Sequence, residues 1–345
     1  MQNILFITSS RIGDAVLSTG LLDYLIKLHP HSRITVAVGR IPAELFQSFP
    51  NVNRVLTIDK RKFGLHWLSV WKKCFGTKWA IVVDLRSGGI STFLRSESSF
   101  IFRSQRRARK YIIFGARQLS KNHRLEEMAK IFNLRKPPNP KIFVSEKDCE
   151  YAKNIIPKKD LVLAFGPTAN WIAKKWRTER FLQLAQKLIR KNGLFEESKI
   201  VIFGLEHERE SIGGLINSLP KGQVIDLVGK VNLRTAYACL ERCKLFVGND
   251  SGLMHLAAAS GIPTIGLFGP SRIEHYRPWG EFTGVASTKK TLEELSGYDG
   301  FKVKNTEALS GDQKLSLESI MDSLSVNEVE KVIRNLWKKV KESSG

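Results

Sequence analysis

Short apolar runs alternate with longer stretches of helical periodicity along the first half of the chain. Residues 3–8, 33–39, 55–58 and 79–85 are rich in Val, Ile and Leu and predict buried strands. Between the first two, residues 14–28 carry leucines three and four positions apart, which predicts a helix with one apolar face. Strands that alternate with helices in this way predict an α/β fold built on a parallel, doubly wound sheet.

The second half of the chain repeats this alternation. Prolines cluster at 136–140, where the first series ends, and a connecting helix is expected at 146–156. The polar stretch 287–316 is expected to be a loop or an insertion. Strands are predicted at 161–165, 199–203, 224–227, 245–247 and 264–268, and helices at 178–192, 206–219, 233–243 and 252–260.

Two similar Rossmann-like, doubly wound domains follow from this pattern, at residues 1–155 and 156–325. The remaining residues, 326–345, are expected to form a C-terminal helix, for which packing back on the N-terminal domain is one option. The length agrees with two domains, because 345 residues are too many for one ordinary core and 42% of them are hydrophobic.

Charge is distributed unevenly between the two halves. The formal net charge is +22, and residues 1–150 carry 26 Lys and Arg against 11 Asp and Glu, a net +15. No acidic residue occurs from 60 to 83 or from 98 to 125. A basic half predicts an anionic partner, which charge alone leaves open among nucleic acid, a phospholipid surface and an anionic glycolipid.

The four cysteines indicate a reducing compartment, because they are few and irregularly spaced. Cys239 and Cys243 lie four apart on a predicted helix without a second ligand pair, so buried thiols are expected rather than a metal site. The apolar run near the N-terminus is too short for a signal peptide, and no run is long enough to span a bilayer. We therefore expect a cytoplasmic protein.

The sequence Gly-Asn-Asp-Ser-Gly at 248–252 follows a predicted buried strand and opens a helix of small residues. Ligands of open α/β sheets bind at the carboxyl ends of strands, and a helix start attracts phosphate. Asp250 or Ser251 is expected to cap this helix, and His255 lies one turn further on the same side. The alternative is a capped helix with glycines that serve only packing.

A second strand-to-helix loop, at 8–14, places Asp14 at a helix start. A carboxylate that faces a cleft between domains can accept a proton from a hydroxyl group. The alternative is an ordinary N-cap aspartate. The glycine spacing does not match the dinucleotide-binding fingerprint.

Two further loops follow predicted strands of the second half. One contains Thr168 and Lys174, whose hydroxyl and ammonium groups can meet a phosphate, although a solvated basic loop would have the same composition. The other contains Glu206 and Glu208, and a carboxylate in this position can hold a ribose diol. Surface glutamates are common, so this second signal is weak alone.

Over nearly its whole length the chain resembles the ADP-heptose:lipopolysaccharide heptosyltransferases of glycosyltransferase family 9. The most specific signature is the segment 248–255 followed by Gly-Pro-Ser at 269–271. A departure is Ser251, where many members carry Thr, which keeps the hydroxyl. The other collinear segments are Ser-Arg-Ile-Gly-Asp at 10–14, 83–86, 122–124 with Glu126, Lys-Lys-Trp at 174–176 and 321–325.

The resemblance implies a GT-B architecture of two Rossmann-like domains that face each other across a cleft. The N-terminal domain would take the acceptor and the C-terminal domain the nucleotide sugar. Transfer would invert the anomeric centre without a bound metal or other cofactor. Asp14 would be the catalytic base, Lys174 would neutralise the donor phosphates and Glu208, or Glu206 in its place, would hold the ribose. The full donor set carried over is Thr168, Lys174, Glu208, Asp250, Ser251, Gly252 and His255.

The basic run of the first half then has an interpretation as the acceptor site, since a lipopolysaccharide acceptor carries phosphate and carboxylate groups that suit arginine. A solvated basic face is the alternative, and attraction to the inner face of the inner membrane, as a peripheral contact, agrees with both. Trp67, Trp71 and Phe75 step at helical spacing and are expected in the core rather than in a membrane. The expected acceptor residues are Arg61, Arg103, Arg106, Arg107, Arg109 and Lys110.

The sequence leaves three alternatives to heptosyl transfer. The first is another family 9 or GT-B transferase that uses a different nucleotide sugar or acceptor. A basic nucleic-acid-binding protein is disfavoured because no recognition module and no aromatic residues interleaved with the arginines are found. A non-catalytic homologue would be expected to lack Asp14 or Asp250, and both are present.

Overall fold

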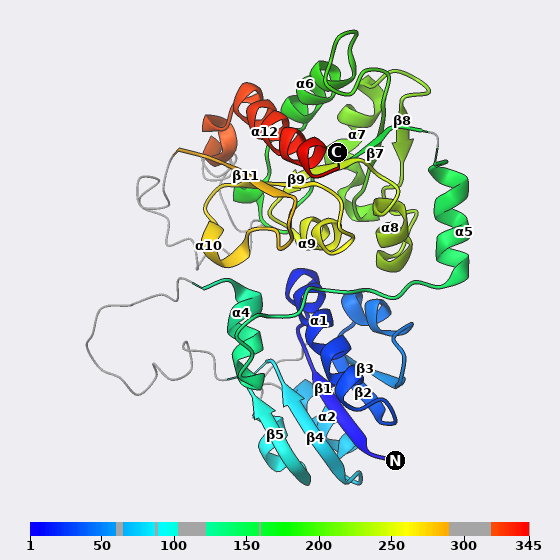
Figure 1. Cartoon of the computed structure of the whole chain (residues 1–345), viewed down its shortest axis with the longest axis vertical. Helices are drawn as coiled ribbons and strands as arrows, with labels where there is room; N and C mark the ends of the chain where they lie inside the picture. Colours follow the sequence, from blue (N-terminus) through cyan, green and yellow to red (C-terminus); the bar gives the residue numbers. More distant parts are fainter. Residues whose placement is uncertain (60–64, 87–88, 103–121, 159, 290–318, 345) are drawn as a thin grey trace, which may run out of the picture. The chain divides into compact units, whose positions relative to one another are not determined.

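The computed structural model describes residues 1–59, 65–86, 89–102, 122–158, 160–289 and 319–344 (Figure 1). The chain divides into two compact units, residues 1–143 and 144–345. The division falls before helix α5 (Glu146–Ile155) rather than after it, where the sequence analysis had placed it. The reason is that α5 packs on α8 (Leu233–Leu240) of the second unit.

The first unit is built on a five-stranded parallel sheet. Its strands are ordered β3-β2-β1-β4-β5. The chain adds β2 and β3 on one side of β1 and then crosses over to add β4 and β5 on the other side, so the switch point lies between β1 and β4. Their bounds are β1 Asn3–Ile7, β2 Arg33–Gly39, β3 Val52–Ile58, β4 Trp79–Asp84 and β5 Ser96–Ile101.

Helical segments cover this sheet. Side chains of α2 and η3 join the strand residues Leu5 and Ile7 in one apolar cluster, while α1 contacts α4 and η1. Figure 1 shows α1 crossing in front of the strands. The segments are α1 Ile12–Leu28, η1 Ile41–Phe46, α2 Leu65–Cys74, η3 Ile90–Phe93, α4 Arg124–Ala129 and η5 Lys130–Phe132.

The second unit has six parallel strands in the order β11-β10-β9-β6-β7-β8. Read from β8, this is the strand order of the Rossmann fold, with the switch point between β6 and β9. The expectation of two Rossmann-like sheets is therefore confirmed. The strands are β6 Val162–Gly166, β7 Lys199–Ile202, β8 Val224–Asp226, β9 Leu245–Asn249, β10 Thr264–Phe268 and β11 Thr283–Ser287.

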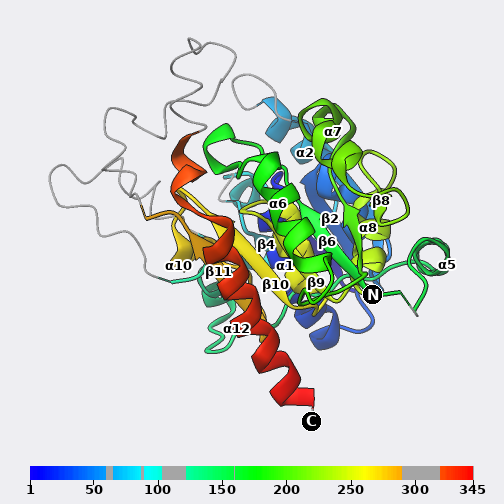
Figure 2. The ribbon, with the colours of Figure 1, turned by 90° about the horizontal axis from the view of Figure 1, so that it is seen from above.

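The final helix, α12 (Val326–Ser344), packs on β11, β10 and α6 of its own unit, as Figures 1 and 2 show. An ion pair of 2.5 Å joins Lys187 Nζ on α6 to Glu330 Oε2 on α12. The other helical segments of this unit are η6 Ile172–Lys174, α6 Thr178–Ile189, η7 Glu206–Glu208, α7 Arg209–Ser218, α9 Gly252–Ala259, α10 Ile273–Tyr276 and η9 Ser319–Ser323.

The cysteines are free thiols; Cys239 and Cys243 are buried as expected, and Cys74 is buried as well. Within the described ranges, no cluster of three or more His, Cys, Asp or Glu side chains could hold a metal ion. None of the helices in the same ranges combines the length and the apolarity needed to cross a membrane.

One core prediction was wrong. Phe75 is 59% exposed, because it follows the last residue of α2 and lies on the outer side of that helix. Trp67 and Trp71 are partly buried against the core of the first unit, in agreement with the expectation.

Candidate active site

The switch point of the second sheet is formed by two glycines. Gly166 ends β6 and pairs in register with Gly248 of β9. A Cβ atom at either glycine would lie within 2.6 Å of the Phe246 ring, so side chains are excluded at both. At Gly248 the structure therefore supports the alternative that the glycine serves packing. The loops that follow β6 and β9 begin from two closely paired strand ends.

Lys174 and Asp250 meet at this edge of the sheet. Lys174 is the last residue of η6, in the loop after β6, and Asp250 directly follows β9. Lys174 Nζ lies 2.6 Å from Asp250 Oδ2, and the side chains are 20% and 5% exposed. The Asp250 carboxylate is thus the partner of a lysine, which places a cation and an anion together at the switch point.

Asn249 ties the two loops together, a role that the sequence analysis missed. Its side chain is fully buried, accepts a hydrogen bond from the Trp176 backbone N–H at 3.0 Å and donates one to the Pro167 carbonyl at 2.7 Å. These bonds hold the Lys174 loop against the end of β9. The signal in the sequence was a polar amide at the end of a predicted buried strand. A buried amide needs hydrogen-bond partners.

Helix α9 begins directly after this ion pair. Ser251 occupies the N-cap position in an extended conformation, but its side chain makes no capping bond. Within the described residues its hydroxyl oxygen is buried and has no hydrogen-bond partner. The expectation that Asp250 or Ser251 caps α9 through its side chain was therefore wrong, since Asp250 binds Lys174. His255 is 5% exposed, one turn along the helix.

Thr168 and Glu208 lie in the loops that follow the neighbouring strands β6 and β7. Thr168 is buried, and its methyl group would lie 3.5 Å from a Cβ atom at Gly204, the residue that opens the loop after β7. Glu208 closes η7 and accepts a hydrogen bond from the Leu205 backbone N–H at 2.8 Å. The loops after β6, β7 and β9 thus bring Thr168, Glu208 and Asp250 to the same edge of one sheet.

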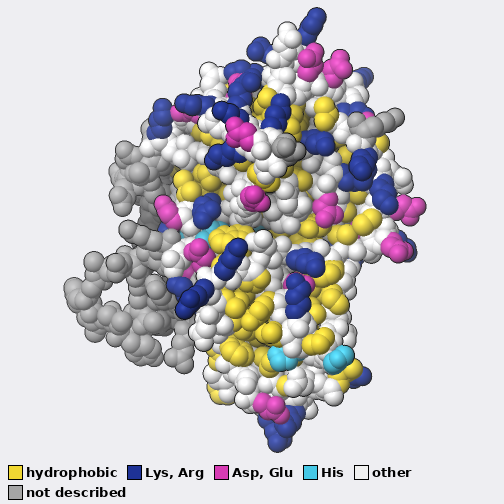
Figure 3. Space-filling model, in the orientation of Figure 1, with side chains coloured by type: hydrophobic (Ala, Val, Ile, Leu, Met, Phe, Trp, Pro, Cys, Tyr) yellow, Lys and Arg dark blue, Asp and Glu magenta, His cyan; other side chains and the backbone are white. Residues whose placement is uncertain are grey.

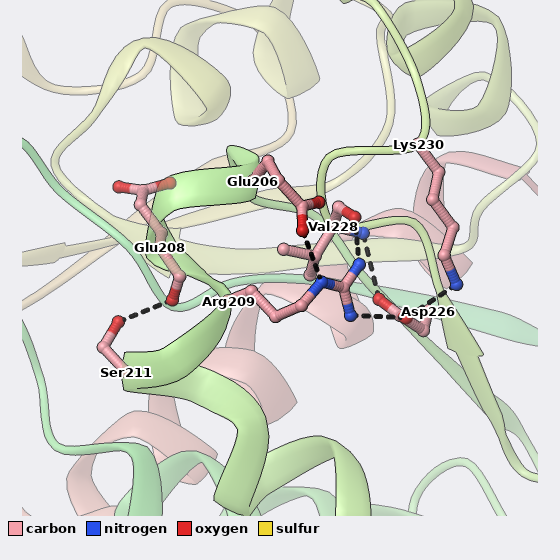
Figure 4. A network of polar contacts seen from close by, with 7 residues as sticks. All are labelled: Glu206, Glu208, Arg209, Ser211, Asp226, Val228 and Lys230. Carbon is pink, nitrogen blue, oxygen red and sulfur yellow. Dashed lines mark hydrogen bonds and ion pairs between the residues drawn. The ribbon is translucent and has the colours of Figure 1, made fainter.

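Figure 4 separates the two glutamates that the sequence left as alternatives. Glu206 points toward Arg209 and binds its Nε at 3.1 Å, whereas the Glu208 carboxylate points away from that guanidinium. The Arg209 guanidinium also forms an ion pair with Asp226, with Nη1 2.9 Å from Oδ2, and Lys230 Nζ lies 2.7 Å from the same oxygen. Glu206 therefore belongs to an ion-pair network, and Glu208 is the glutamate outside it.

In the first unit, Asp14 lies in the first turn of α1, whose N-cap residue is Arg11. It is therefore not an N-cap aspartate. Its Oδ1 lies 3.3 Å from Arg124 Nε, and Ser9 Oγ donates to Oδ2 at 3.4 Å. Both the Asp14 and Arg124 side chains are less than one-fifth exposed, at 18% and 17%. The carboxylate is thus oriented by a cation and a hydroxyl at the carboxyl edge of the first sheet.

Asp84 lies at the switch point of that sheet, where it pairs in register with Ile7. It is fully buried, and it accepts hydrogen bonds from the Arg86 backbone N–H at 2.8 Å and from Ser91 Oγ at 3.0 Å. These bonds make Asp84 an organiser of the loop after β4. The expected acceptor residues Arg61, Arg103, Arg106, Arg107, Arg109 and Lys110 lie outside the described residues.

Comparison of the fold with solved structures shows which class of enzyme shares it. The chain superposes on a glycosyl transferase family 9 protein from Veillonella parvula with a TM-score of 0.74, at 22% identity and over 98% of both chains. It superposes on E. coli ADP-heptose lps heptosyltransferase II with a TM-score of 0.69, at 21% identity, over 99% of this chain and 100% of the other. The fold is that of the GT-B heptosyltransferases.

Sequence comparison gives the family. The sequence profile of glycosyltransferase family 9 (heptosyltransferase) matches residues 78–298, well over half of the chain. The lipopolysaccharide heptosyltransferase 2 of Salmonella typhimurium is 25% identical over 340 residues, which cover 90% of this chain and 92% of that protein. The chain belongs to glycosyltransferase family 9.

Proposed function

We propose that this glycosyltransferase moves heptose from ADP-heptose to an anionic acceptor in the inner core of lipopolysaccharide. The observation that carries the proposal is the Lys174–Asp250 ion pair directly before the first turn of α9, at the switch point of a Rossmann sheet. Nucleotides bind at this position in such sheets. The Salmonella typhimurium relative and the E. coli structure named above are heptosyltransferases, and this supports heptose as the transferred sugar.

The donor binds along the carboxyl edge of the second sheet. Lys174 and the backbone N–H groups at the start of α9 meet the diphosphate, where negative charge develops as the nucleoside diphosphate leaves. The unpartnered Ser251 hydroxyl and buried His255 lie beside this helix start and line the phosphate and sugar site with Gly252. Thr168 lies in the loop before Lys174, and Glu208 takes the ribose hydroxyl groups because it is outside the Glu206–Arg209 network.

Asp14 acts as the base. Its carboxylate accepts the proton of the acceptor hydroxyl, the hydroxyl oxygen forms a bond to the anomeric carbon, and the bond from that carbon to the diphosphate breaks with inversion. Arg124 binds Oδ1 and Ser9 binds Oδ2, and each oxygen has a further lone pair with which to accept a proton. Positioned bases of this kind contribute about 10²- to 10⁴-fold to rate.

The acceptor is bound by the first unit. Its expected contacts are Arg61, Arg103, Arg106, Arg107, Arg109 and Lys110, within the half that carries a net +15. Because such an acceptor is anchored in a bilayer, the enzyme works at the inner face of the inner membrane as a peripheral protein. Figure 3 shows Lys and Arg side chains distributed over the visible surface of both units, which suits an anionic surface.

A donor panel tests the proposal. The purified protein is incubated with a heptose-deficient core acceptor and, separately, with ADP-heptose, ADP-glucose and UDP-glucose, while release of nucleoside diphosphate is followed. Acceptor-dependent release only from ADP-heptose is expected. Release only from another donor would show a transferase of different specificity on the same fold.

A further inference from the structure

The outer side of α2 carries an apolar surface. Leu65, Leu68 and Phe75 are 54%, 49% and 59% exposed, and Phe93 of η3 is 74% exposed. Positions 65, 68, 72 and 75 are spaced three and four apart, so their side chains share one side of the helix. Phe75 continues this helical turn, because its backbone N–H donates to the Trp71 carbonyl at 2.8 Å.

The opposite side of α2 already packs on the sheet. Val70 and Cys74 are buried, and Trp67 and Trp71 lie partly buried against the same core. The helix is therefore apolar on two sides, although folding of the first unit requires only one. Four large exposed apolar side chains on two neighbouring segments point to an interaction surface.

Phe93 belongs to the same surface as α2. The Trp71 indole N–H donates to the Phe93 carbonyl at 3.1 Å, and the Trp71 and Phe75 rings lie 4.4 Å apart. Trp71 thus joins η3 to the end of α2, where Phe75 lies. We name the set Leu65, Leu68, Phe75 and Phe93 the α2–η3 surface.

The charged residues of α2 itself are lysines. Lys72 lies within the apolar stripe, Lys73 follows it, and both are exposed. Helix α2 contains no acidic residue. Glu97 of β5 is paired with Lys78 at 3.0 Å, and Asp59, directly after β3, is paired with Arg40 at 2.6 Å. The surface therefore presents apolar groups and net positive charge together.

We propose that the α2–η3 surface docks the enzyme on an anionic phospholipid bilayer, an inference that rests on the proposed function for the lipid-borne acceptor. Exposed Leu and Phe side chains interleaved with lysine are the combination that binds the headgroup region of anionic membranes. A second copy of the chain fits less well. In a two-fold interface the same patch faces itself, so Lys72 and Lys73 would meet like charges.

Vesicle sedimentation tests this inference without any substrate. The full chain is mixed with sucrose-loaded vesicles of phosphatidylglycerol and phosphatidylethanolamine, and in parallel with vesicles of phosphatidylcholine. We expect binding to the anionic vesicles that falls at least about tenfold for Leu68→Ser/Phe75→Ser, since two apolar groups are withdrawn from the bilayer. Lys72→Glu/Lys73→Glu should weaken it to a similar or greater degree.

Matched controls lie in the second unit. Leu161→Ser removes a leucine of similar exposure, 47%, and Lys338→Glu/Lys339→Glu makes the same charge change on α12. Both controls should bind vesicles like the unchanged protein, and thermal melting shows that every variant is folded. Equal binding by the α2 variants and the controls, or equal binding to both vesicle types, would overturn the proposal. So would a dimer, seen by analytical ultracentrifugation, that Leu68→Ser/Phe75→Ser dissociates.

Turnover on a water-soluble truncated acceptor separates this inference from the proposed function. The α2 variants should keep that turnover, because none of the changed residues is placed at the donor or acceptor site. Anionic-vesicle binding without heptosyl transfer would contradict the proposed function alone. Transfer without selective vesicle binding would contradict the docking surface alone.

Discussion

Lys174 and Asp250 illustrate how single residues define this site. A carboxylate that is 5% exposed is costly to bury unless a cation or hydrogen-bond donors compensate for the lost water, and here Lys174 Nζ supplies the compensation at 2.6 Å. The pair therefore serves stability in the free enzyme. In the proposed complex the same ammonium group also faces the donor diphosphate, so one residue serves folding and binding.

Replacing Lys174 by Met should weaken both functions. The change removes the charge and keeps most of the aliphatic chain, so Asp250 stays buried without its cation. The free energy of unfolding should fall by about 1–3 kcal/mol in urea denaturation. ADP affinity, measured by calorimetry, should fall about tenfold or more. Lys175→Met is the control and should change neither quantity much; an unchanged ADP affinity in Lys174→Met would exclude the phosphate role.

Asp226 gives a pH-dependent prediction. Burial acts to raise its pKa, but hydrogen bonds from Lys230, Arg209 and the Val228 N–H outweigh burial and lower the pKa below its ordinary value. A lowered pKa in the folded state contributes stability that is complete above the unfolded value, near about 3.9, and is lost as pH falls through the folded pKa.

Comparison of Asp226→Asn with the unchanged protein measures this contribution. The difference in unfolding free energy should be largest at neutral pH and should shrink as the pH is lowered below about 4. Urea denaturation at a series of pH values provides the measurement. A difference that stays constant over this range would mean that ionisation of Asp226 does not contribute to stability.

The residues at the donor edge were predictable because each follows a strand of a parallel sheet. That rule gathers Thr168, Lys174 and Asp250 without any structure. It does not say that Asp250 pairs with Lys174 or that Ser251 leaves α9 uncapped by its side chain. Those outcomes depend on which side chains the loops turn inward, and Asn249 fixes that through bonds to two distant backbone groups.

At the scale of elements, α5 and α8 are joined by a buried polar contact. Asp148 is 6% exposed, and its Oδ1 accepts a hydrogen bond from Thr235 Oγ1 at 2.6 Å. Its Oδ2 caps α5 through the Ser145 backbone N–H at 3.1 Å. One carboxylate thus starts α5 and anchors it to α8, which explains why this helix belongs to the second unit.

Thr235→Val should loosen this anchor. The new side chain has nearly the same shape but cannot donate to Asp148, so a buried carboxylate loses one bond. We expect a loss of about 1–3 kcal/mol in the free energy of unfolding, with earlier amide exchange in α5 than elsewhere in the unit. Thr178→Val, at the partly exposed start of α6, is the control. Equal losses in the two variants would contradict the anchoring role.

Most strands could be predicted from periodicity, and the two strands that could not, β5 and β11, each lie at the edge of a sheet. β5 reads Ser-Glu-Ser-Ser-Phe-Ile and β11 reads Thr-Gly-Val-Ala-Ser, and neither contains an apolar run. An edge strand pairs on one side only, so it does not need the apolar sequence of a central strand. The sequence pattern therefore detected every central strand but only one edge strand of each sheet, β3 and β8.

At the scale of the whole molecule, two units of one fold carry different chemistry. The second unit holds Lys174, the start of α9 and Glu208, the proposed ribose ligand, and the first holds Asp14 in a half with a net charge of +15. Binding of ADP should therefore stabilise only the second unit directly. At an ADP concentration of about 100 times Kd, this stabilisation amounts to about 2.7 kcal/mol.

Hydrogen–deuterium exchange with and without ADP tests whether the nucleotide protects only the second unit. Protection should increase in the loops after β6 and β9 and in the first turn of α9. Exchange in β2 and β3 of the first unit should not change. ADP-dependent protection centred on the first unit would show that the nucleotide site had been assigned to the wrong unit.

Product analysis tests the proposed heptosyl transfer and the proposed role of Asp14 as the base. The protein and its Asp14→Asn variant are each incubated with ADP-heptose and a heptose-deficient core acceptor, and the acceptor is analysed by mass spectrometry. We expect addition of one heptose by the unchanged protein and a rate at least about 10²-fold lower for Asp14→Asn, with ADP binding retained. No heptosylated product from the unchanged protein would exclude heptosyl transfer, and a variant rate within about tenfold of the unchanged protein would exclude Asp14 as the base.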